Sequence, residues 1–364
     1  MSTLAVNAVT DANGGNTATI NSMTPTADSL QGFRNRIING DMRIDQRNAG
    51  AAVTINSASN TYSVDRFFGR GDTSDGVFTL DQTTTAPAGF TNSVLATVTT
   101  ADASIGATQR YQIGQRIEGF NIADLGWGTA SAKTVTLSFW VRSSLTGTFG
   151  GALTNAAANR SYPYTYTISS ADTWEQKSVT IAGDTSGTWE TGTAIGIQLL
   201  FSLGAGSTYL GTAGSWAATL YTGVTGQTQV IGTLNATWYI TGVQLEVGSV
   251  ASSFERRPYG TELALAQRYY QTYLQDMLYK FAVRGYVDNL NSLVSSHILQ
   301  TQMRAAPTAT KVGTWTVSGC AQPTVPSTST QQMSVFAERN AGGTGDTYFW
   351  ASGTSQGITL SAEL

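Results

Sequence analysis

The stretch TVTLSFWVR, residues 134–142, points to the fold class because apolar and polar side chains alternate along it. Successive side chains of a strand point to opposite faces, so the four apolar residues from Val135 to Val141 should share one face. Similar stretches recur every one to two dozen residues: VTIN (53–56), GVFTLDQ (76–82), SVLATVTT (93–100), EQKSVTIAG (175–183), AIGIQLLFSLG (194–204) and ATWYITGVQLEVG (236–248). This spacing, without helical periods in between, predicts a mainly β protein built as an antiparallel β-sandwich.

The composition agrees with a folded, turn-rich β protein. Charged residues make up only 12% of the 364 residues, against about 25% in an average domain. Apolar residues still reach 41%, which is enough to form a core, and the length predicts two or three domains. With so few charges to protect its sheet edges, the chain should hide those edges in an oligomer.

Several classes of protein are disfavoured by the same numbers. A formal net charge of -3 lacks the basic excess that binds nucleic acid. No stretch approaches 18 apolar residues, and residues 1–10 lack the pattern of a signal peptide, so neither membrane insertion nor ordinary secretion is expected. With Cys320 as the single cysteine and His297 as the single histidine, we expect no disulfide, zinc site, Ser-His catalysis or cofactor.

One segment, residues 261–281, breaks the β pattern. Pro258 and Gly260 precede it, Thr261 can act as N-cap, and apolar residues recur at helical spacing before an aromatic run that favours a strand after about Tyr269. We therefore expect a short helix between two β domains. The expected division is an N-terminal attachment segment (1–32), a central sandwich (33–259), a helix and linker (260–276) and a distal β domain (277–364).

Specific segments resemble a group of bacteriophage tail-fibre and tail-associated proteins. They are NRIINGDM (35–42), YSVDRF (62–67), QRIEGF (115–120), TLSFWVR (136–142) and, most specific, TWYITGVQLEVGSVASSFERRPYGTELALAQRYYQ (237–271). In this last run Ala266 stands where cysteine is common in that family. The resemblance covers roughly residues 33–305.

The resemblance implies a jelly-roll-like central domain similar to carbohydrate-binding modules, and a homotrimeric fibre located in the virion tail. It also implies attachment to other tail proteins through the N-terminal segment and a distal domain that faces a glycan or envelope receptor of the host. We expect adsorption without catalysis. Two alternatives stay open, namely a structural adaptor or decoration protein of the virion and a polysaccharide depolymerase.

Aromatic side chains are the best candidates for binding, because a flat ring matches the C–H face of a sugar. Trp127 and Trp216 lie in loops rich in Gly, Ala and Ser. In the distal domain Tyr348, Phe349 and Trp350 follow one another, and three successive side chains of a strand cannot all face one core. At least one should face solvent, a ligand or a neighbouring subunit.

Acidic residues offer weaker candidates. Asp41 with Asp45, or Glu175 with Glu190, could supply the two carboxyl groups of a glycosidase, but acidic residues in turns are more often caps. Two stretches are candidates for a calcium site, namely Asp72 with Asp75, and Asp11 with Asn13 and Asn16. Neither stretch has the spacing of an EF-hand loop, so a turn is the favoured interpretation of both.

Overall fold

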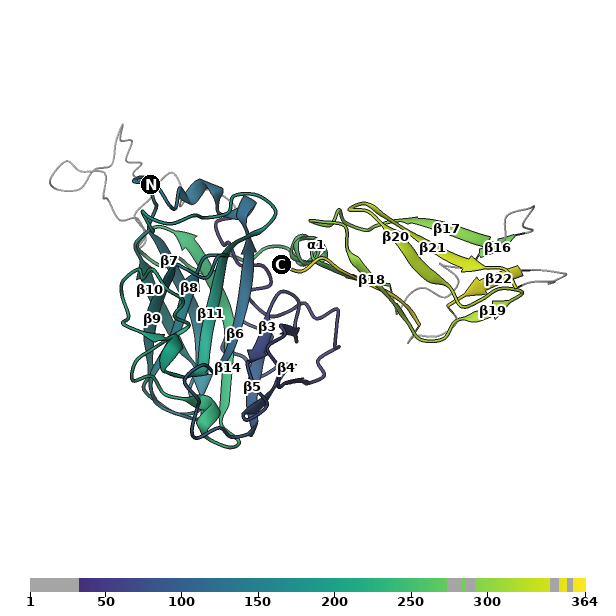
Figure 1. Ribbon diagram of the computed structural model, residues 1–364. Helices are drawn as coiled ribbons and strands as arrows, with labels where there is room; N and C mark the ends of the chain where they lie inside the picture. Colours follow the sequence, from purple (N-terminus) through teal and green to yellow (C-terminus); the bar gives the residue numbers. More distant parts are fainter. Residues whose placement is uncertain (1–32, 274–282, 286–291, 341–346, 352–355) are drawn as a thin grey trace, which may run out of the picture.

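The computed structural model describes residues 33–273, 283–285, 292–340, 347–351 and 356–364. It shows a large central β-sandwich and a smaller, elongated β part, joined through one short helix (Figure 1). The predicted mainly β, antiparallel fold is confirmed. The expected attachment segment, residues 1–32, lies outside the described residues. Within the described ranges no helix combines the length and the apolar character needed to cross a membrane.

Two six-stranded antiparallel sheets form the central sandwich. The first has the order β1 (Val53–Ile55), β4 (Val77–Thr83), β5 (Ser93–Thr100), β14 (Thr237–Val247), β7 (Val135–Ser143) and β10 (Glu175–Ile181). The second has the order β2 (Thr61–Tyr62), β3 (Phe68–Gly71), β6 (Arg110–Glu118), β11 (Ile195–Ala205), β8 (Gly147–Thr154) and β9 (Ser161–Ile168). Strands β5, β6, β7 and β8 lie alternately in the first and second sheets, and so do β9, β10 and β11, so the chain crosses repeatedly between the sheets, as in a jelly roll.

The core lies between the two sheets. The apolar residues of β7 from Val135 to Val141 are fully buried, which confirms the predicted face. The Phe139 ring meets the Tyr166 and Phe201 rings of the opposite sheet at 5.0 and 5.1 Å between centroids. Burial of such large rings contributes much of the apolar area that stabilises the sandwich.

A long connection between β11 and β14 covers part of the second sheet. It contains η3 (Ser207–Tyr209), β12 (Leu210–Gly211), β13 (Gly223–Val224) and η4 (Val230–Gly232). Gln227 donates from Nε2 to Ser202 Oγ at 2.7 Å, and Ala217 pairs with Ser161 of β9. The outer face of β8, β9 and β11 is therefore partly closed by the chain itself. Two further short helices, η1 (Gly119–Asn121) and η2 (Ala123–Leu125), follow β6.

The expected helix is present as α1 (Tyr259–Gln267), but its predicted N-cap is wrong. Pro258 occupies the cap position, and its carbonyl accepts the amides of Thr261 and Glu262 at 3.0 and 3.1 Å. Thr261 consequently lies inside the first turn, where its side chain cannot act as a cap. The predicted change to a strand after Tyr269 is confirmed by β15 (Tyr270–Thr272).

The C-terminal part consists of three small antiparallel sheets around a core of its own. Their orders are β15-β23-β18, β16-β22-β19 and β17-β21-β20. The strands not yet given are β16 (Val283–Gly285), β17 (Ser292–Ile298), β18 (Thr308–Val312), β19 (Thr316–Ser318), β20 (Thr324–Thr328), β21 (Gln332–Glu338), β22 (Thr347–Trp350) and β23 (Gly357–Ser361). In Figure 1, β16, β19 and β22 lie at the end of this part that is farthest from the central sandwich.

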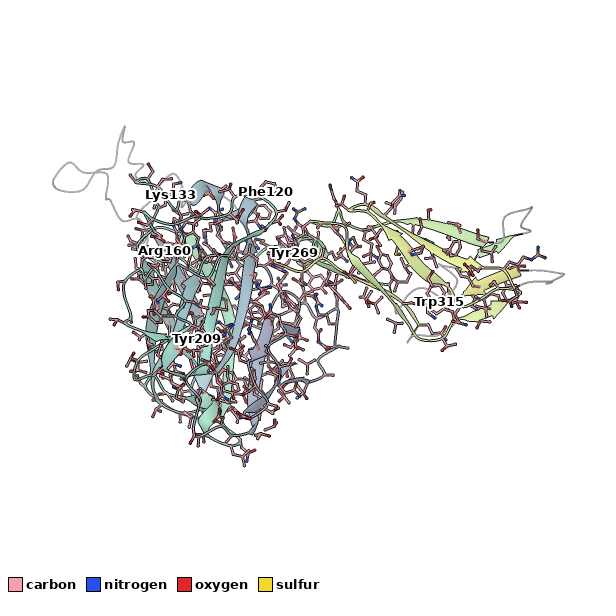
Figure 2. All side chains as sticks on the ribbon, viewed as in Figure 1. Phe120, Lys133, Arg160, Tyr209, Tyr269 and Trp315 are labelled. Carbon is pink, nitrogen blue, oxygen red and sulfur yellow. The ribbon has the colours of Figure 1, made fainter. Side chains whose placement is uncertain are left out.

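The last residues of the chain return to the junction between the two parts. Glu363 forms ion pairs with Arg66 and, at 2.5 Å, with Arg47, both from the central sandwich. Arg268, just after α1, donates two hydrogen bonds of 2.9 and 2.7 Å to Glu118 of β6. The Arg66 guanidinium also lies 3.5 Å from the centroid of the Tyr269 ring. These contacts hold the two parts together, and Tyr269 marks their position in Figure 2.

Candidate functional site

Strand β22 places two aromatic rings on the outer face of the distal sheet. Phe349 is fully buried and packs beside Trp315, which Figure 2 labels, whereas Tyr348 and Trp350 point to the opposite face. Their rings stack at 4.6 Å between centroids with an interplanar angle of 15°. Both are half-buried. The alternation expected for the three successive aromatics is thus present.

The neighbouring strand supplies hydroxyl groups beside this pair, which we call the tip pair. Tyr348 lies opposite Ser318 of β19, and Trp350 lies opposite Thr316. Ring surfaces next to hydroxyl groups suit a ligand that offers both C–H faces and hydroxyls, which is the chemistry of a sugar. The tip pair could equally pack against a neighbouring subunit, since aromatic residues are enriched in interfaces as well.

The structure brings the two loop tryptophans together in one cluster with Trp189. The centroid of the Trp127 ring lies 4.8 Å from that of Trp189 and 5.3 Å from that of Trp216. The Trp189 and Trp216 centroids are 5.4 Å apart. Trp127 is only 6% exposed, and its Nε1 donates to the Lys133 carbonyl at 2.8 Å. Trp127 therefore serves packing, and only Trp216 retains surface for a ligand.

Polar contacts lie next to Trp216, whose ring centroid is 6.0 Å from the Arg160 guanidinium. Arg160, labelled in Figure 2, donates two hydrogen bonds of 2.7 and 2.5 Å to the buried Asp184 carboxylate, and these bonds raise the pKa of Arg160. Trp216 donates from Nε1 to the Ala182 carbonyl at 2.8 Å. Trp189 was missed at the sequence level because it lies in a polar run, SGTWETG, that gives no sign of its neighbours in space.

The acidic candidates for catalysis are largely occupied by structural contacts. Asp45 accepts the backbone amides of Arg47, Asn48 and Gly50 at 3.0, 2.8 and 2.6 Å. Glu175 pairs with Lys177 at 2.5 Å and accepts two further amides. Asp41 forms an ion pair with Arg43, and Glu190 is exposed. These contacts match the roles of loop caps and structural ion pairs.

The metal and histidine candidates are similarly engaged. The Asp72 carboxylate forms ion pairs with Arg70 and Arg110, whose Nε atoms lie 2.7 and 2.8 Å from its oxygens. Two cationic side chains therefore already neutralise it. Across the described ranges no three His, Cys, Asp or Glu side chains come close enough to hold a metal ion. His297 lies on β17 with Nε2 2.8 Å from Ser295 Oγ, and burial lowers its pKa. The calcium candidates at residues 11–16 lie outside the described residues.

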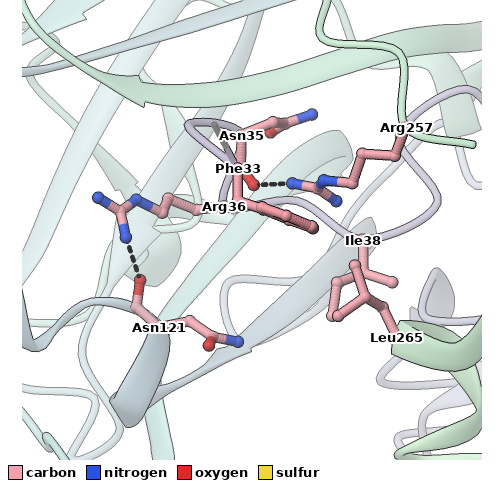
Figure 3. A pocket seen from close by; sticks show the side chains of 7 residues that line it. All are labelled: Phe33, Asn35, Arg36, Ile38, Asn121, Arg257 and Leu265. Atoms are coloured by element: carbon pink, nitrogen blue, oxygen red, sulfur yellow. Dashed lines mark hydrogen bonds between the residues drawn. The ribbon is translucent and has the colours of Figure 1, made fainter. Parts of the chain in front are cut away.

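A small pocket lies where the N-terminal end of the described sandwich meets α1 (Figure 3). Its walls include Phe33, Arg36, Arg257 and Leu265, and its volume is about 90 Å³. Arg36 donates from Nη1 to the Asn121 carbonyl at 3.1 Å across one side. Ligand pockets usually measure about 300–1,000 Å³, so this pocket is too small for a sugar ring.

No family model matches the chain, and no curated protein matches it either. Among solved structures, the enzymatically active domain of tailspike protein 4 of bacteriophage CBA120 is similar at 11% identity, with a TM-score of 0.31. That match covers 60% of this chain and 22% of the tailspike chain, so the chain spans about a fifth of that protein.

Two further solved structures are similar at comparably low identity and TM-score. A protein from Bacteroides thetaiotaomicron, assigned to sugar binding only provisionally, has 14% identity and a TM-score of 0.35 over 59% of this chain and 100% of its own. The family 11 carbohydrate-binding module of Clostridium thermocellum, bound to a mixed-linked tetrasaccharide, has 9% identity and a TM-score of 0.28 over 53% and 95%. Similarities this low identify no ligand for the present chain.

Proposed function

We propose that this protein is a non-catalytic adhesin of a bacteriophage tail that binds a glycan on the host surface through its distal domain. The chain would act as a homotrimeric fibre, attached to other tail proteins through its N-terminal segment. Each tip would bind a sugar weakly. Repeated fibres around a tail would raise the effective concentration of tips and convert weak contacts into firm attachment.

The observation that carries this proposal is the tip pair. Tyr348 and Trp350 stack on an outer face instead of joining the core with Phe349. Their strand lies at the end of the molecule farthest from the central sandwich (Figure 1). An adhesin needs its binding surface at such an end, where it can reach the cell before the remainder of the fibre does.

A second candidate function, a structural protein of the virion, is favoured by a different surface. On β17, at the edge of its sheet, Val294 is 55% exposed and Ile298 is 86% exposed. Exposed apolar side chains on an edge strand are typical of surfaces that another chain covers. In the proposed fibre this surface would lie between subunits, whereas a structural role would need no exposed tip.

Competition for adsorption tests the proposal. Purified full-length protein, added to host cells before phage, should block adsorption, and the double variant Tyr348→Ala/Trp350→Ala should lose that effect at least tenfold. Trp174→Ala is the matched control, because Trp174 is also half-buried but lies in the central sandwich. Equal blocking by the double variant would move recognition away from the tip pair. Absence of blocking by correctly folded wild type would favour the structural role.

A further inference from the structure

We propose that the central sandwich carries a second sugar-binding site, in a depression next to the point where β11 ends. The depression has a volume of about 480 Å³, within the usual range for small-molecule sites. It is distinct from the tip pair and from the tryptophan cluster. The residues that matter are Asp102, Ser104, Ile105, Ser207, Leu210 and Gln229.

Main-chain hydrogen bonds tie the walls of this depression together before any ligand arrives. Asp102 donates its amide to the Ile231 carbonyl of η4 at 2.9 Å. Gly206, just after β11, donates to the Gln109 carbonyl at 2.8 Å. The loop before β6, the end of β11 and η4 are thus fixed to one another. A site that is already formed avoids much of the entropy cost of binding.

Asp102 provides a buried carboxylate at the edge of the depression. It is 8% exposed and accepts hydrogen bonds from the Tyr111 hydroxyl at 2.9 Å and the Ser104 amide at 3.1 Å. Among the described residues it has no cationic partner, although a buried carboxylate without a counter-charge is costly. A carboxylate has about four acceptor positions, so two remain for the hydroxyls of a ligand.

Gln229 adds an amide whose orientation is fixed. Its Oε1 accepts the Ala205 amide and its Nε2 donates to the Ala205 carbonyl, both at 3.0 Å. The second Nε2 hydrogen is left to donate to a ligand oxygen. Ser104 and Ser207 are exposed at the rim, while Ile105 and Leu210 add apolar wall surface. Tyr209, which Figure 2 labels, lies in η3 between Ser207 and Leu210 in the sequence.

This set of groups selects a neutral hydroxylated ring. Hydroxyls of a sugar can donate to Asp102 and accept from Gln229, while its C–H face meets the apolar wall. An anion would be repelled by the Asp102 carboxylate. A calcium ion takes six to eight oxygen ligands, and the depression offers a single carboxylate.

Saturation-transfer NMR with the full chain tests the site, using the methyl glycosides of glucose, galactose, N-acetylglucosamine and rhamnose as probes. Ser207→Trp should fill the depression from an exposed position without disturbing the core, and Asp102→Asn should remove the acceptor charge. Ser249→Trp is the matched control, because Ser249 is an exposed turn serine outside both sites. The double variant at Tyr348 and Trp350 separates this site from the tip.

At least one glycoside should bind the wild type, the Ser249→Trp control and the tip variant alike. Its Kd should rise at least tenfold in Ser207→Trp and in Asp102→Asn. The inference is overturned if none of the glycosides binds, or if Ser207→Trp binds as well as the control. A signal that chelation of calcium abolishes would also overturn it. The tip variant retains the residues of this depression. A negative result at the depression therefore does not affect the adsorption test of the tip pair.

Discussion

At the scale of single residues, Asp65 is a buried acid at the junction. Its carboxylate accepts the Gln46 amide at 2.7 Å and lies 3.6 Å from Arg47. Burial outweighs both contacts and raises the pKa of Asp65 from the ordinary 3.8 to about 7. Between pH 3.8 and about 7, the Asp65 carboxyl is therefore protonated in the folded chain and ionised in the unfolded chain.

The free energy of unfolding should accordingly fall as the pH rises from about 4 to about 7, by at most about 1.4 kcal/mol per pH unit from this residue. The Asp65→Asn variant lacks this pH-dependent contribution. Its free energy of unfolding should therefore rise relative to that of the wild type as the pH increases from about 4 to about 7. Urea titrations at pH 4.5, 5.5 and 6.5 measure the difference. A constant difference between the two proteins would show that Asp65 titrates normally.

At the scale of elements, the buried packing residue Phe349 of β22 lies between the two residues of the proposed binding surface, Tyr348 and Trp350. Phe349→Ala should destabilise the C-terminal part by about 3–5 kcal/mol, because it opens a cavity in that core. Trp350→Ala should cost only about 1 kcal/mol, since it removes one ring from a half-buried stack. Thermal unfolding of both variants tests the alternation. Equal losses would mean that the Trp350 ring is structural.

The predictable elements are those whose side chains alternate locally. The faces of TVTLSFWVR and of β22 follow from the two-residue period, because each is a property of one strand. The N-cap of α1 was predicted wrongly. Rules based on side-chain chemistry favour Thr261, whereas Pro258 occupies the cap position and caps the helix through its carbonyl. The tryptophan cluster and the depression at Asp102 could not be predicted, because loops distant in sequence assemble them.

At the scale of the whole molecule, Glu363 connects the end of the chain to the central sandwich. Its side chain is 9% exposed and faces Arg66, which is 1% exposed. Glu363→Ala would leave the Arg66 charge buried and unpaired, which costs about 3 kcal/mol. Hydrogen exchange at β15 and β23 should therefore become much faster in this variant.

Glu338→Ala is the control for that experiment, because Glu338 is exposed and lies on β21 of the same part. Unchanged exchange in Glu363→Ala would show that the junction depends on the Arg268 and Glu118 contact instead. A rigid junction matters to the proposed function, since a fibre transmits its orientation to the tip through this point.

The most direct test of the adhesin account is a glycan array probed with the full-length protein and with Tyr348→Ala/Trp350→Ala, followed by analysis of the bound glycans. The account predicts that the wild type binds a defined set of bacterial surface glycans, that the double variant loses at least tenfold in apparent affinity, and that the glycans are recovered uncut. Binding that survives the double substitution, or glycans shortened by the protein, would contradict it.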